Sequence, residues 1–127
     1  MRHIFRLRID AITVGYKEIF KKNHHFYSTD LYGWTNCPIE YLDKDKSIGL
    51  YDKNQQMLFE NDICIHKKTG ATIACLFKKN SPIFIDCDLL TQINPDDIIH
   101  FCKELKRIAF LLQHPSQVEV KEMLALL

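Results

Sequence analysis

Residues 48–65 read Ile-Gly-Leu-Tyr-Asp-Lys-Asn-Gln-Gln-Met-Leu-Phe-Glu-Asn-Asp-Ile-Cys-Ile, and this stretch decides most of the fold. Short apolar runs alternate in it with residues that favour turns, which predicts a strand, a tight turn, a strand, a second turn and another strand. Asn61 belongs to the residue types that best tolerate a left-handed backbone, so the second turn can form without glycine. We interpret the polar residues of the stretch as turn-forming rather than catalytic: Asp52, Asn54, Glu60 and Asp62.

The overall composition predicts one folded domain. With 127 residues, the chain fits a single domain, 1–127, which is long enough to bury a core without disulfides or a structural metal. Hydrophobic residues make up 46% of the chain and charged residues 26%, which is ordinary for a folded protein. The formal net charge is +1, so no overall field draws the chain to nucleic acid or acidic membranes.

The cysteines and the N-terminus predict a reducing compartment. Five cysteines are widely spaced and no Cys-x-x-Cys occurs, which does not suit a disulfide framework. Residues 1–8 are interrupted by charges and lack the apolar core of a signal peptide. No apolar run approaches the roughly 20 residues that a membrane helix needs. We therefore expect a cytoplasmic protein that does not interact with a membrane.

The N-terminal third predicts two strands and a long irregular segment. Residues 4–9 alternate with a period of two, which indicates a strand that buries Phe5, Leu7 and Ile9. Residues 12–20 favour a second strand, although Gly15 interrupts them. Residues 21–47 show no regular pattern and are expected to form loops. The alternating charges Asp43, Lys44, Asp45 and Lys46 are expected to form a solvated part of those loops.

The C-terminal half predicts a hairpin followed by helices. Residues 72–77 and 82–85 are expected strands, and residues 67–70 form the turn before the first of them. Asn94 suits a helix N-cap, and the helix is expected to run to about Lys106. The spacing of the apolar residues supports this helix: Ile98, Phe101, Cys102, Leu105 and Ile108. Periodicity leaves 109–113 open between helix and strand, and 117–127 are expected to form a short second helix that either docks in the core or presents its leucines to another subunit.

The run Gly-Leu-Tyr-Asp-Lys-Asn at 49–54, followed by Glu-Asn-Asp-Ile at 60–63, resembles the YopX family of phage and prophage proteins. Residues 108–111 followed by His114-Pro115 resemble the closing strand of that family, which favours strand over helix there. The resemblance implies a small fold related to SH3-like barrels and no established enzymatic activity. We therefore expect an α+β, mainly β protein: a small SH3-like β barrel with one or two C-terminal helices, forming a single YopX-like domain.

Side chains that could carry chemistry are present, but none forms a recognised motif. His24 and His25 are interpreted as exposed loop residues, because neighbours on an extended chain point to opposite sides and rarely bind one ion. Four cysteines lie in predicted strands or on an apolar helix face, where free cysteine behaves as a small hydrophobe: Cys64, Cys75, Cys87 and Cys102. Cys37 lies in a loop and would need a histidine and a carboxylate nearby to act as a nucleophile. We expect no catalytic residues, no metal and no cofactor.

Two sets of residues are candidates for binding. Aromatic and leucine side chains are the candidates for a protein partner: Trp34, Tyr32, Tyr51, Leu124 and Leu127. Trp34 could instead anchor the long loop in the core. The lysines of two turns are the candidates for nucleic acid, or are simply solvated: Lys67, Lys68, Lys78 and Lys79. These two lysine pairs are expected at opposite ends of one hairpin, which disfavours a compact basic patch.

Together these observations favour a non-catalytic accessory protein of phage or prophage origin. It is expected to lie in the cytoplasm of a bacterial host cell, to bind a host bacterial protein and to modulate or inhibit it, for example as an inhibitor of a defence system such as an anti-CRISPR protein. Self-association into a homo-oligomer is a further expectation for its partners. The alternative is a nucleic-acid-binding small-barrel module, and a third hypothesis is a small enzyme.

Overall fold

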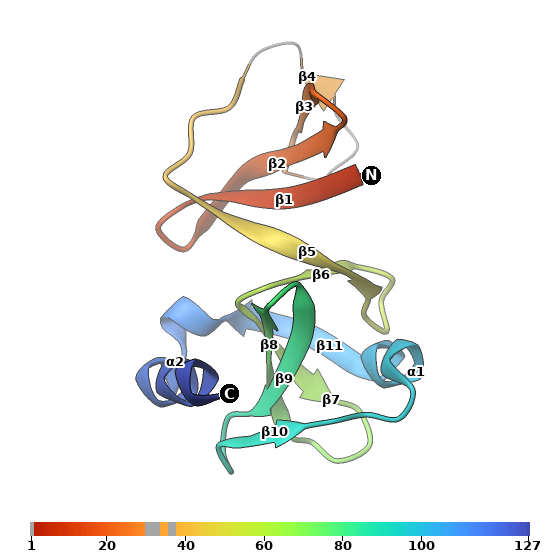
Figure 1. Cartoon of the computed structure of the whole chain (residues 1–127), viewed down its shortest axis with the longest axis vertical. Coiled ribbons are helices and arrows are strands. Elements are labelled where there is room, and N and C mark those ends of the chain that lie inside the picture. Colours follow the sequence, from red (N-terminus) through yellow and green to blue (C-terminus); the bar gives the residue numbers. More distant parts are fainter. Residues whose placement is uncertain (1, 30–33, 36–37) are drawn as a thin grey trace. The chain divides into compact units, whose positions relative to one another are not determined.

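The computed structural model of the chain describes residues 2–29, 34–35 and 38–127. The chain forms two compact units, Met1–Ser47 and Ile48–Leu127, which we call unit 1 and unit 2 and describe separately. The fold is small, α+β and mainly β, with two antiparallel sheets and two short helices (Figure 1). Neither sheet closes into a barrel among the described residues, so the expected SH3-like barrel and the single YopX-like domain stay predictions.

Unit 1 is built from antiparallel strands in the order β4-β3-β2-β1-β5. The strands are β1 (Arg2–Ile9), β2 (Ile12–Phe20), β3 (Asn23–Tyr27), β4 (Trp34–Thr35) and β5 (Asp43–Tyr51). The first two match the expected strands. Residues 21–47 were expected to be irregular, and that prediction is wrong for β3, β4 and the first half of β5. These strands form because pairing with β2, β3 and β1, respectively, outweighs weak local propensity.

The charged run at 43–46 is the largest departure from expectation. Asp45 was expected in a solvated loop, but it is fully buried in β5 between Arg6 and Arg8, which are themselves 1% and 5% exposed. Its carboxylate accepts bonds from Arg6 Nη2 at 2.7 Å and from Arg8 Nε at 2.6 Å. The expected buried face of β1 is confirmed at Leu7, which is fully buried, and is wrong at Ile9, which is 38% exposed. Arg6, Arg8 and Asp45 lie on the other face of the sheet, where they can be buried because their opposite charges are brought together.

Unit 2 contains the end of β5, which neighbours β6 (Met57–Phe59), and a sheet in the order β10-β9-β8-β7-β11. Its strands are β7 (Asp62–His66), β8 (Thr72–Lys78), β9 (Ser81–Asp86), β10 (Thr91–Ile93) and β11 (Leu105–Phe110). The helices are α1 (Ile98–Lys103), the 3₁₀ turn η1 (Leu111–Gln113) and α2 (Gln117–Leu126). The predicted strand-turn-strand pattern of residues 48–65 is confirmed.

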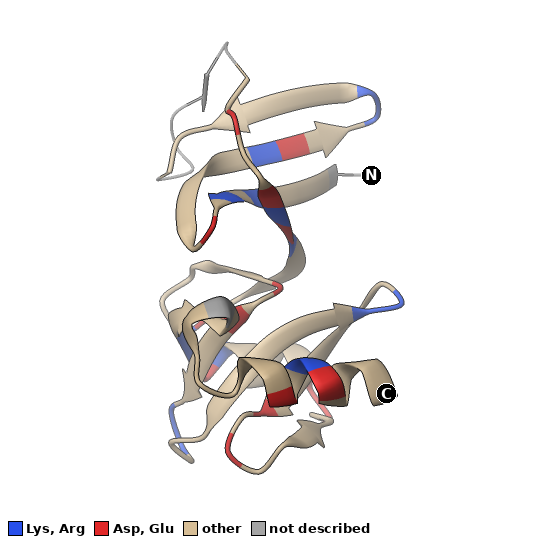
Figure 2. Cartoon of the chain, turned by 90° about the vertical axis from the view of Figure 1, so that its left-hand side faces the viewer, with Lys and Arg blue, Asp and Glu red and all other residues tan. Residues whose placement is uncertain are grey.

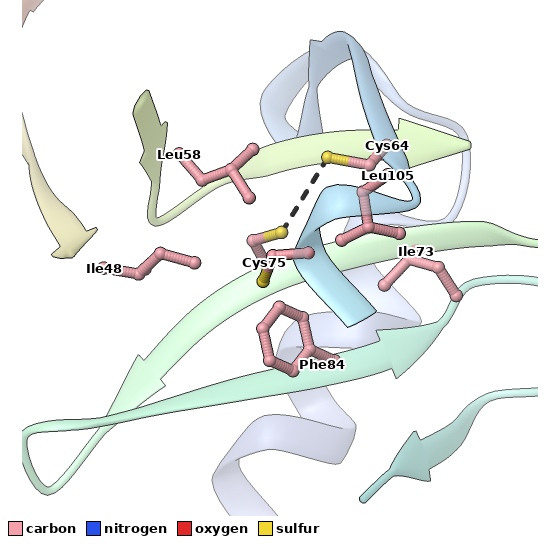
Figure 3. Close-up of a cluster of buried hydrophobic side chains, with 8 residues drawn as sticks. Ile48, Leu58, Cys64, Ile73, Cys75, Phe84 and Leu105 are labelled. Atoms are coloured by element: carbon pink, nitrogen blue, oxygen red, sulfur yellow. Dashed lines mark hydrogen bonds between the residues drawn. The ribbon is translucent and has the colours of Figure 1, made fainter. Parts of the chain in front are cut away.

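The two faces of the five-stranded sheet are buried by different elements. Alternate residues of β8 show this, because Ile73 and Cys75 belong to one buried cluster and Ala74 and Leu76 to the other. The first cluster includes residues of β5, β6, α1 and β11 and is drawn in Figure 3. The second cluster includes Leu111 of η1 and Val120 of α2. The core of unit 2 therefore has an α1 side and an α2 side.

The predicted helix from Asn94 to about Lys106 is too long at both ends. Helix α1 begins at Ile98, and its N-cap is Asp97, whose carboxylate accepts the backbone N–H of His100 at 3.0 Å. It ends at Lys103, and residues from Leu105 onward pair with β7 instead. Leu105 still packs in the same buried cluster as Cys102, although Cys102 lies in α1 and Leu105 lies in β11. The strand suggested for 108–111 by the family resemblance is confirmed through Phe110.

Helix α2 forms where expected, and its contacts decide which apolar residues are inward. Val120 is buried, and Met123 and Leu124 pack against the second cluster. Val118 and Leu126 remain 62% and 88% exposed. Lys78 of β8 holds the C-terminal end of the helix, since its Nζ donates to the carbonyl of Leu124 at 2.8 Å. The helix therefore docks through its middle turns. No helix among the described residues is long and apolar enough to cross a membrane.

Candidate functional site

An open apolar hollow lies on the surface of unit 1. It has a volume of about 480 Å³ and is lined by Ile9, Ile39, Glu40, Tyr41 and Leu42. Leu42 is 71% exposed, and Ile12, which pairs with Ile9 across the β1–β2 turn, is 67% exposed. Exposed aliphatic side chains around a concave surface are typical of binding sites. We call this surface, including Ile12, the unit 1 hollow.

Local backbone contacts hold the hollow in place. The N–H of Leu42 donates to the carbonyl of Arg8 at 2.9 Å, which ties the segment before β5 to the end of β1. Ile39 packs directly on β2 at Gly15, where a Cβ atom would lie only 2.5 Å from Ile39 Cδ1. Glycine within β2 therefore has a packing reason, since it admits the side chain that lines the hollow.

The exposed charged residues near the hollow in the chain are of both signs. Glu40 lines it, and Asp10 and Asp43 directly follow Ile9 and Leu42 in the chain; all three side chains are exposed. Lys44 is exposed too and pairs with Leu7, so it shares the sheet face of Ile9. Two other nearby cations are largely buried. The Arg8 guanidinium is bonded to Asp45 and, at 2.7 Å, to the main-chain oxygen of Asp10. Lys17 is buried beneath Tyr41, with 5.7 Å between its Nζ and the centre of that ring.

A second cluster of charged side chains surrounds Glu104 in unit 2. One carboxylate oxygen lies 2.6 Å from His100 Nε2 and 3.2 Å from Lys68 Nζ, and the other lies 3.3 Å from His66 Nε2. Partial burial raises the pKa of Glu104, but the hydrogen bond and charge of Lys68 and the charges of His100 and His66 lower it by more, so the pKa lies below its ordinary value. His66 Nδ1 accepts two backbone N–H groups, which leaves the proton on Nε2, toward Glu104.

This cluster fastens the end of α1 to the β7–β8 turn. The Lys67 N–H donates to the Glu104 carbonyl at 2.7 Å, and the ring of His66 lies 5.3 Å from that of Phe101. The polar atoms of the side chains around Glu104 therefore hold the helix end and the turn together. No group of three or more His, Cys, Asp or Glu among the residues that the structure describes is placed to hold a metal ion.

A smaller cleft of about 290 Å³ lies beside the start of α2 and is lined by Cys87, Asp88, Leu90, Pro115, Ser116 and Glu119. His114 Nδ1 lies 2.6 Å from Ser116 Oγ, a pairing that resembles a nucleophile and its base. The same nitrogen also accepts the backbone N–H of Ser116 at 3.2 Å, which is a local turn that starts the helix. Burial raises the pKa of Cys87, although a hydrogen bond from Ser116 opposes this, so the thiol is a poor nucleophile.

The three other described cysteines form part of the α1-side core. Cys64 Sγ and Cys75 Sγ are 3.9 Å apart and are joined by a dashed line in Figure 3, and Cys102 lies in the same cluster. Their hydrogen bond, together with burial, raises the pKa of Cys75 well above its usual value, and burial raises the pKa of Cys102 to about 12. The prediction that these cysteines and Cys87 are buried hydrophobes is confirmed. Cys37 lies outside the described residues.

The described residues that were expected to bind a protein partner lie on different elements. Tyr51 is exposed on β5, Leu127 is 41% exposed at the end of α2, and Leu124 is half-buried against the core. Trp34 is in β4, but its side chain and all of Tyr32 lie outside what the structure describes. The unit 1 hollow was missed because Ile9 was assigned to a buried face. The useful signal was the apolar pair Ile9 and Ile12 on either side of a polar turn.

The expected basic and histidine residues are also separate. Lys67 and Lys68 lie in the β7–β8 turn, whereas Lys78 and Lys79 lie at the other end of β8, and Figure 2 shows basic residues at both ends of this hairpin. The expectation that the two lysine pairs lie at opposite ends of this strand is confirmed. His24 and His25 were expected in a loop, but they are in β3, paired with β2.

Comparison with known proteins finds no family model that matches this chain and no matching curated sequence.

Proposed function

We propose that this protein is a non-catalytic accessory protein of phage or prophage origin that binds a host bacterial protein and modulates or inhibits it. The unit 1 hollow carries the binding part of this proposal. Interfaces are anchored by apolar side chains in concave, well-packed sites with a polar rim. Ile12 and Leu42 offer such anchors, because each keeps about two-thirds of its surface exposed.

The origin and the kind of partner rest on the resemblance of residues 49–63 to the YopX family. The relation of the fold to SH3-like barrels belongs to the same proposal. The polar side chains around Glu104 and around Ser116 in unit 2 do not favour an enzymatic function, because their polar atoms are used in turns and at helix ends. Inhibition of a defence system is the example of modulation that we favour.

Affinity capture from bacterial lysate tests the proposal when the hollow is varied. The wild-type chain is expected to retain a specific protein that a Leu42→Asp variant releases. Val118→Asp is the matched control, since Val118 is an exposed apolar residue of α2 with 62% of its surface accessible. Nuclease treatment should leave capture unchanged, whereas a nucleic-acid-binding module would lose its partners. Capture of the same proteins by all three chains would contradict the proposal.

A further inference from the structure

A cluster of exposed lysines surrounds the junction between α1 and β11 in unit 2. Leu105 begins β11, and its carbonyl accepts the N–H of Lys53 at 2.8 Å. The carbonyl of Glu104 accepts the N–H of Lys67 at 2.7 Å, and one oxygen of its side chain lies 3.2 Å from Lys68 Nζ. The chain itself places one more lysine on each side of Glu104 and Leu105. We call the five exposed residues the junction lysines: Lys53, Lys67, Lys68, Lys103 and Lys106.

The junction lysines cover a corner of unit 2 rather than one face of its sheet. Lys103 is the last residue of α1, whereas Lys106 follows the inward-facing Leu105 and so leaves the opposite face of β11. Lys53 lies beyond β11, which is the last strand of its sheet. The β5–β6 turn and α1 lie on the same side of unit 2 in Figure 1. A flexible polymer that crosses this edge can therefore reach lysines on both faces.

Carboxylates cancel little of this positive charge. Among the residues that the structure describes, Lys68 is the one junction lysine that forms a salt bridge, and its partner is Glu104. Asp52 lies in the same turn as a junction lysine, but it is 2% exposed and accepts backbone N–H groups. Two exposed aspartates precede α1, at the end of the helix away from β11: Asp96 and Asp97. The junction therefore presents a surplus of positive charge.

Exposed aromatic rings lie beside the junction lysines. Tyr51 is 52% exposed and precedes Lys53 by two residues. The side chain of His100 is 66% exposed, and its Nε2 lies 2.6 Å from the same Glu104 oxygen that Lys68 contacts. Aromatic rings among lysines are typical of surfaces that bind single-stranded nucleic acid, because bases stack on the rings while phosphates meet the cations. An acidic protein segment would match the lysines but would supply no bases to stack.

From this arrangement we infer that the junction lysines bind the backbone of a single-stranded nucleic acid and that Tyr51 stacks on one of its bases. Lysine suits this role because it contacts phosphate as a point charge and does not need the fixed geometry of arginine. The surface lies in unit 2, whereas the proposed protein-binding hollow lies in unit 1. This second binding activity therefore goes beyond the proposed function.

A fluorescein-labelled oligothymidylate of about 20 nucleotides is the probe, and fluorescence anisotropy with the full chain measures its affinity. Contacts with about three or four phosphates predict that log Kd rises with the logarithm of the salt concentration with a slope of about 2.1–2.8, or about 0.7 for each contact on a single strand. The affinity should therefore fall about 20- to 50-fold between ~50 and ~200 mM salt. Absence of binding at ~50 mM salt would overturn the inference.

A charge-matched pair of double variants locates the surface. Lys53→Gln with Lys106→Gln removes two junction lysines, and should weaken binding by about tenfold or more at ~50 mM salt and lower the slope by about 1.4. The control, Lys79→Gln with Lys121→Gln, removes two exposed lysines of unit 2 outside the junction and should leave the affinity within about twofold. Urea unfolding should confirm that both variants remain folded. Equal weakening by the two double variants would overturn the inference, because the attraction would then follow net charge alone.

Tyr51 separates base stacking from attraction between charges. Tyr51→Ala should weaken oligothymidylate by about fivefold or more with the salt slope unchanged, whereas Tyr51→Phe should keep the affinity. If Tyr51→Ala has no effect, or if duplex DNA binds as tightly, the assignment to a single strand is overturned. If a polyglutamate peptide of about 20 residues competes as well as unlabelled oligothymidylate, the surface accepts any polyanion and the assignment to nucleic acid is overturned. The proposed function is tested separately, through capture that depends on Leu42.

Discussion

Replacing Asp45 with asparagine tests the ion network that organises unit 1. The carboxylate of Asp45 is fully buried and accepts hydrogen bonds from Arg6 Nε at 2.9 Å, Arg6 Nη2 at 2.7 Å, Arg8 Nε at 2.6 Å and Arg8 Nη2 at 2.8 Å. No buried side-chain nitrogen or oxygen among the described residues lacks a partner. Asparagine keeps the size of the side chain but removes its charge and turns one acceptor into a donor that faces guanidinium N–H groups.

The loss of stability in Asp45→Asn is set by the guanidinium groups of Arg6 and Arg8, which remain buried. Losing charge-assisted hydrogen bonds at about 1.5–3 kcal/mol each would sum to about 6–12 kcal/mol for the four bonds. Relaxation and water entry reduce such sums, and breaking a buried ion pair from one side costs about 3–5 kcal/mol. A segment of the size of Met1–Ser47 has a total stability of about 2–7 kcal/mol at the usual value per residue. Asp45→Asn is therefore expected to unfold unit 1 largely or completely.

Hydrogen exchange read by mass spectrometry distinguishes the two units. Peptides from β1, β2 and β5 should lose protection in Asp45→Asn, while those from β8 and β9 keep it. Asp43→Asn, at an exposed site on the same strand, should change stability by no more than about 0.5 kcal/mol. Replacing Arg6, Arg8 and Asp45 together by apolar residues should cost less than Asp45→Asn, because no charge is left behind. A loss below about 1 kcal/mol in Asp45→Asn would refute this account of the network.

Three further substitutions test unit 2. Glu104→Gln should lower the free energy of unfolding at neutral pH. This loss of stability should shrink as the pH falls below 4.5 through the lowered pKa of Glu104, because the carboxylate is then protonated in the wild type too. Urea titrations across pH would contradict this if the loss of stability grew in acid. Asp52→Ala should lower the free energy of unfolding in urea by about 1–3 kcal/mol, because the Asp52 carboxylate accepts three backbone N–H groups. An effect below about 0.5 kcal/mol would mean that the turn does not depend on this carboxylate. Lys78→Met should destabilise the chain by about 1 kcal/mol and speed exchange at the end of α2, whereas Lys79→Met, at the neighbouring exposed position, should do neither; equal effects would refute the role of Lys78.

The turns could be predicted from the sequence because the hydrogen bonds that form them are local. The Asp52 carboxylate accepts the N–H groups of Asn54 and Gln56, both at 2.9 Å and only a few residues away. Asn61 adopts a φ of 70°, as its residue type allows. The Asp62 carboxylate accepts the Phe59 N–H at 2.8 Å across the second turn. No distant partner is needed to infer any of these features.

Long-range partners explain what the sequence did not predict. An alternating charge run looks the same whether it is solvated or buried, and the partner that buries Asp45 lies 39 residues away at Arg6. Likewise, the apolar spacing of Cys102 and Leu105 suits a continuous helix and equally a helix followed by a strand. Pairing of Leu105 with His66 of β7 decides between them. The unit 1 hollow was missed for the same reason, since it joins Ile9 to a segment some thirty residues later.

The buried thiols of unit 2 can report how its core opens. Alkylating reagents attack the thiolate of an accessible cysteine. Cys64, Cys75 and Cys102 are fully buried, and raised pKa values also keep Cys75 and Cys102 protonated. Each can react only during the moments when the core around it separates. The order in which these positions and Cys87 become labelled in the native protein therefore reports whether the α1 side and the α2 side of the core open together or one after the other.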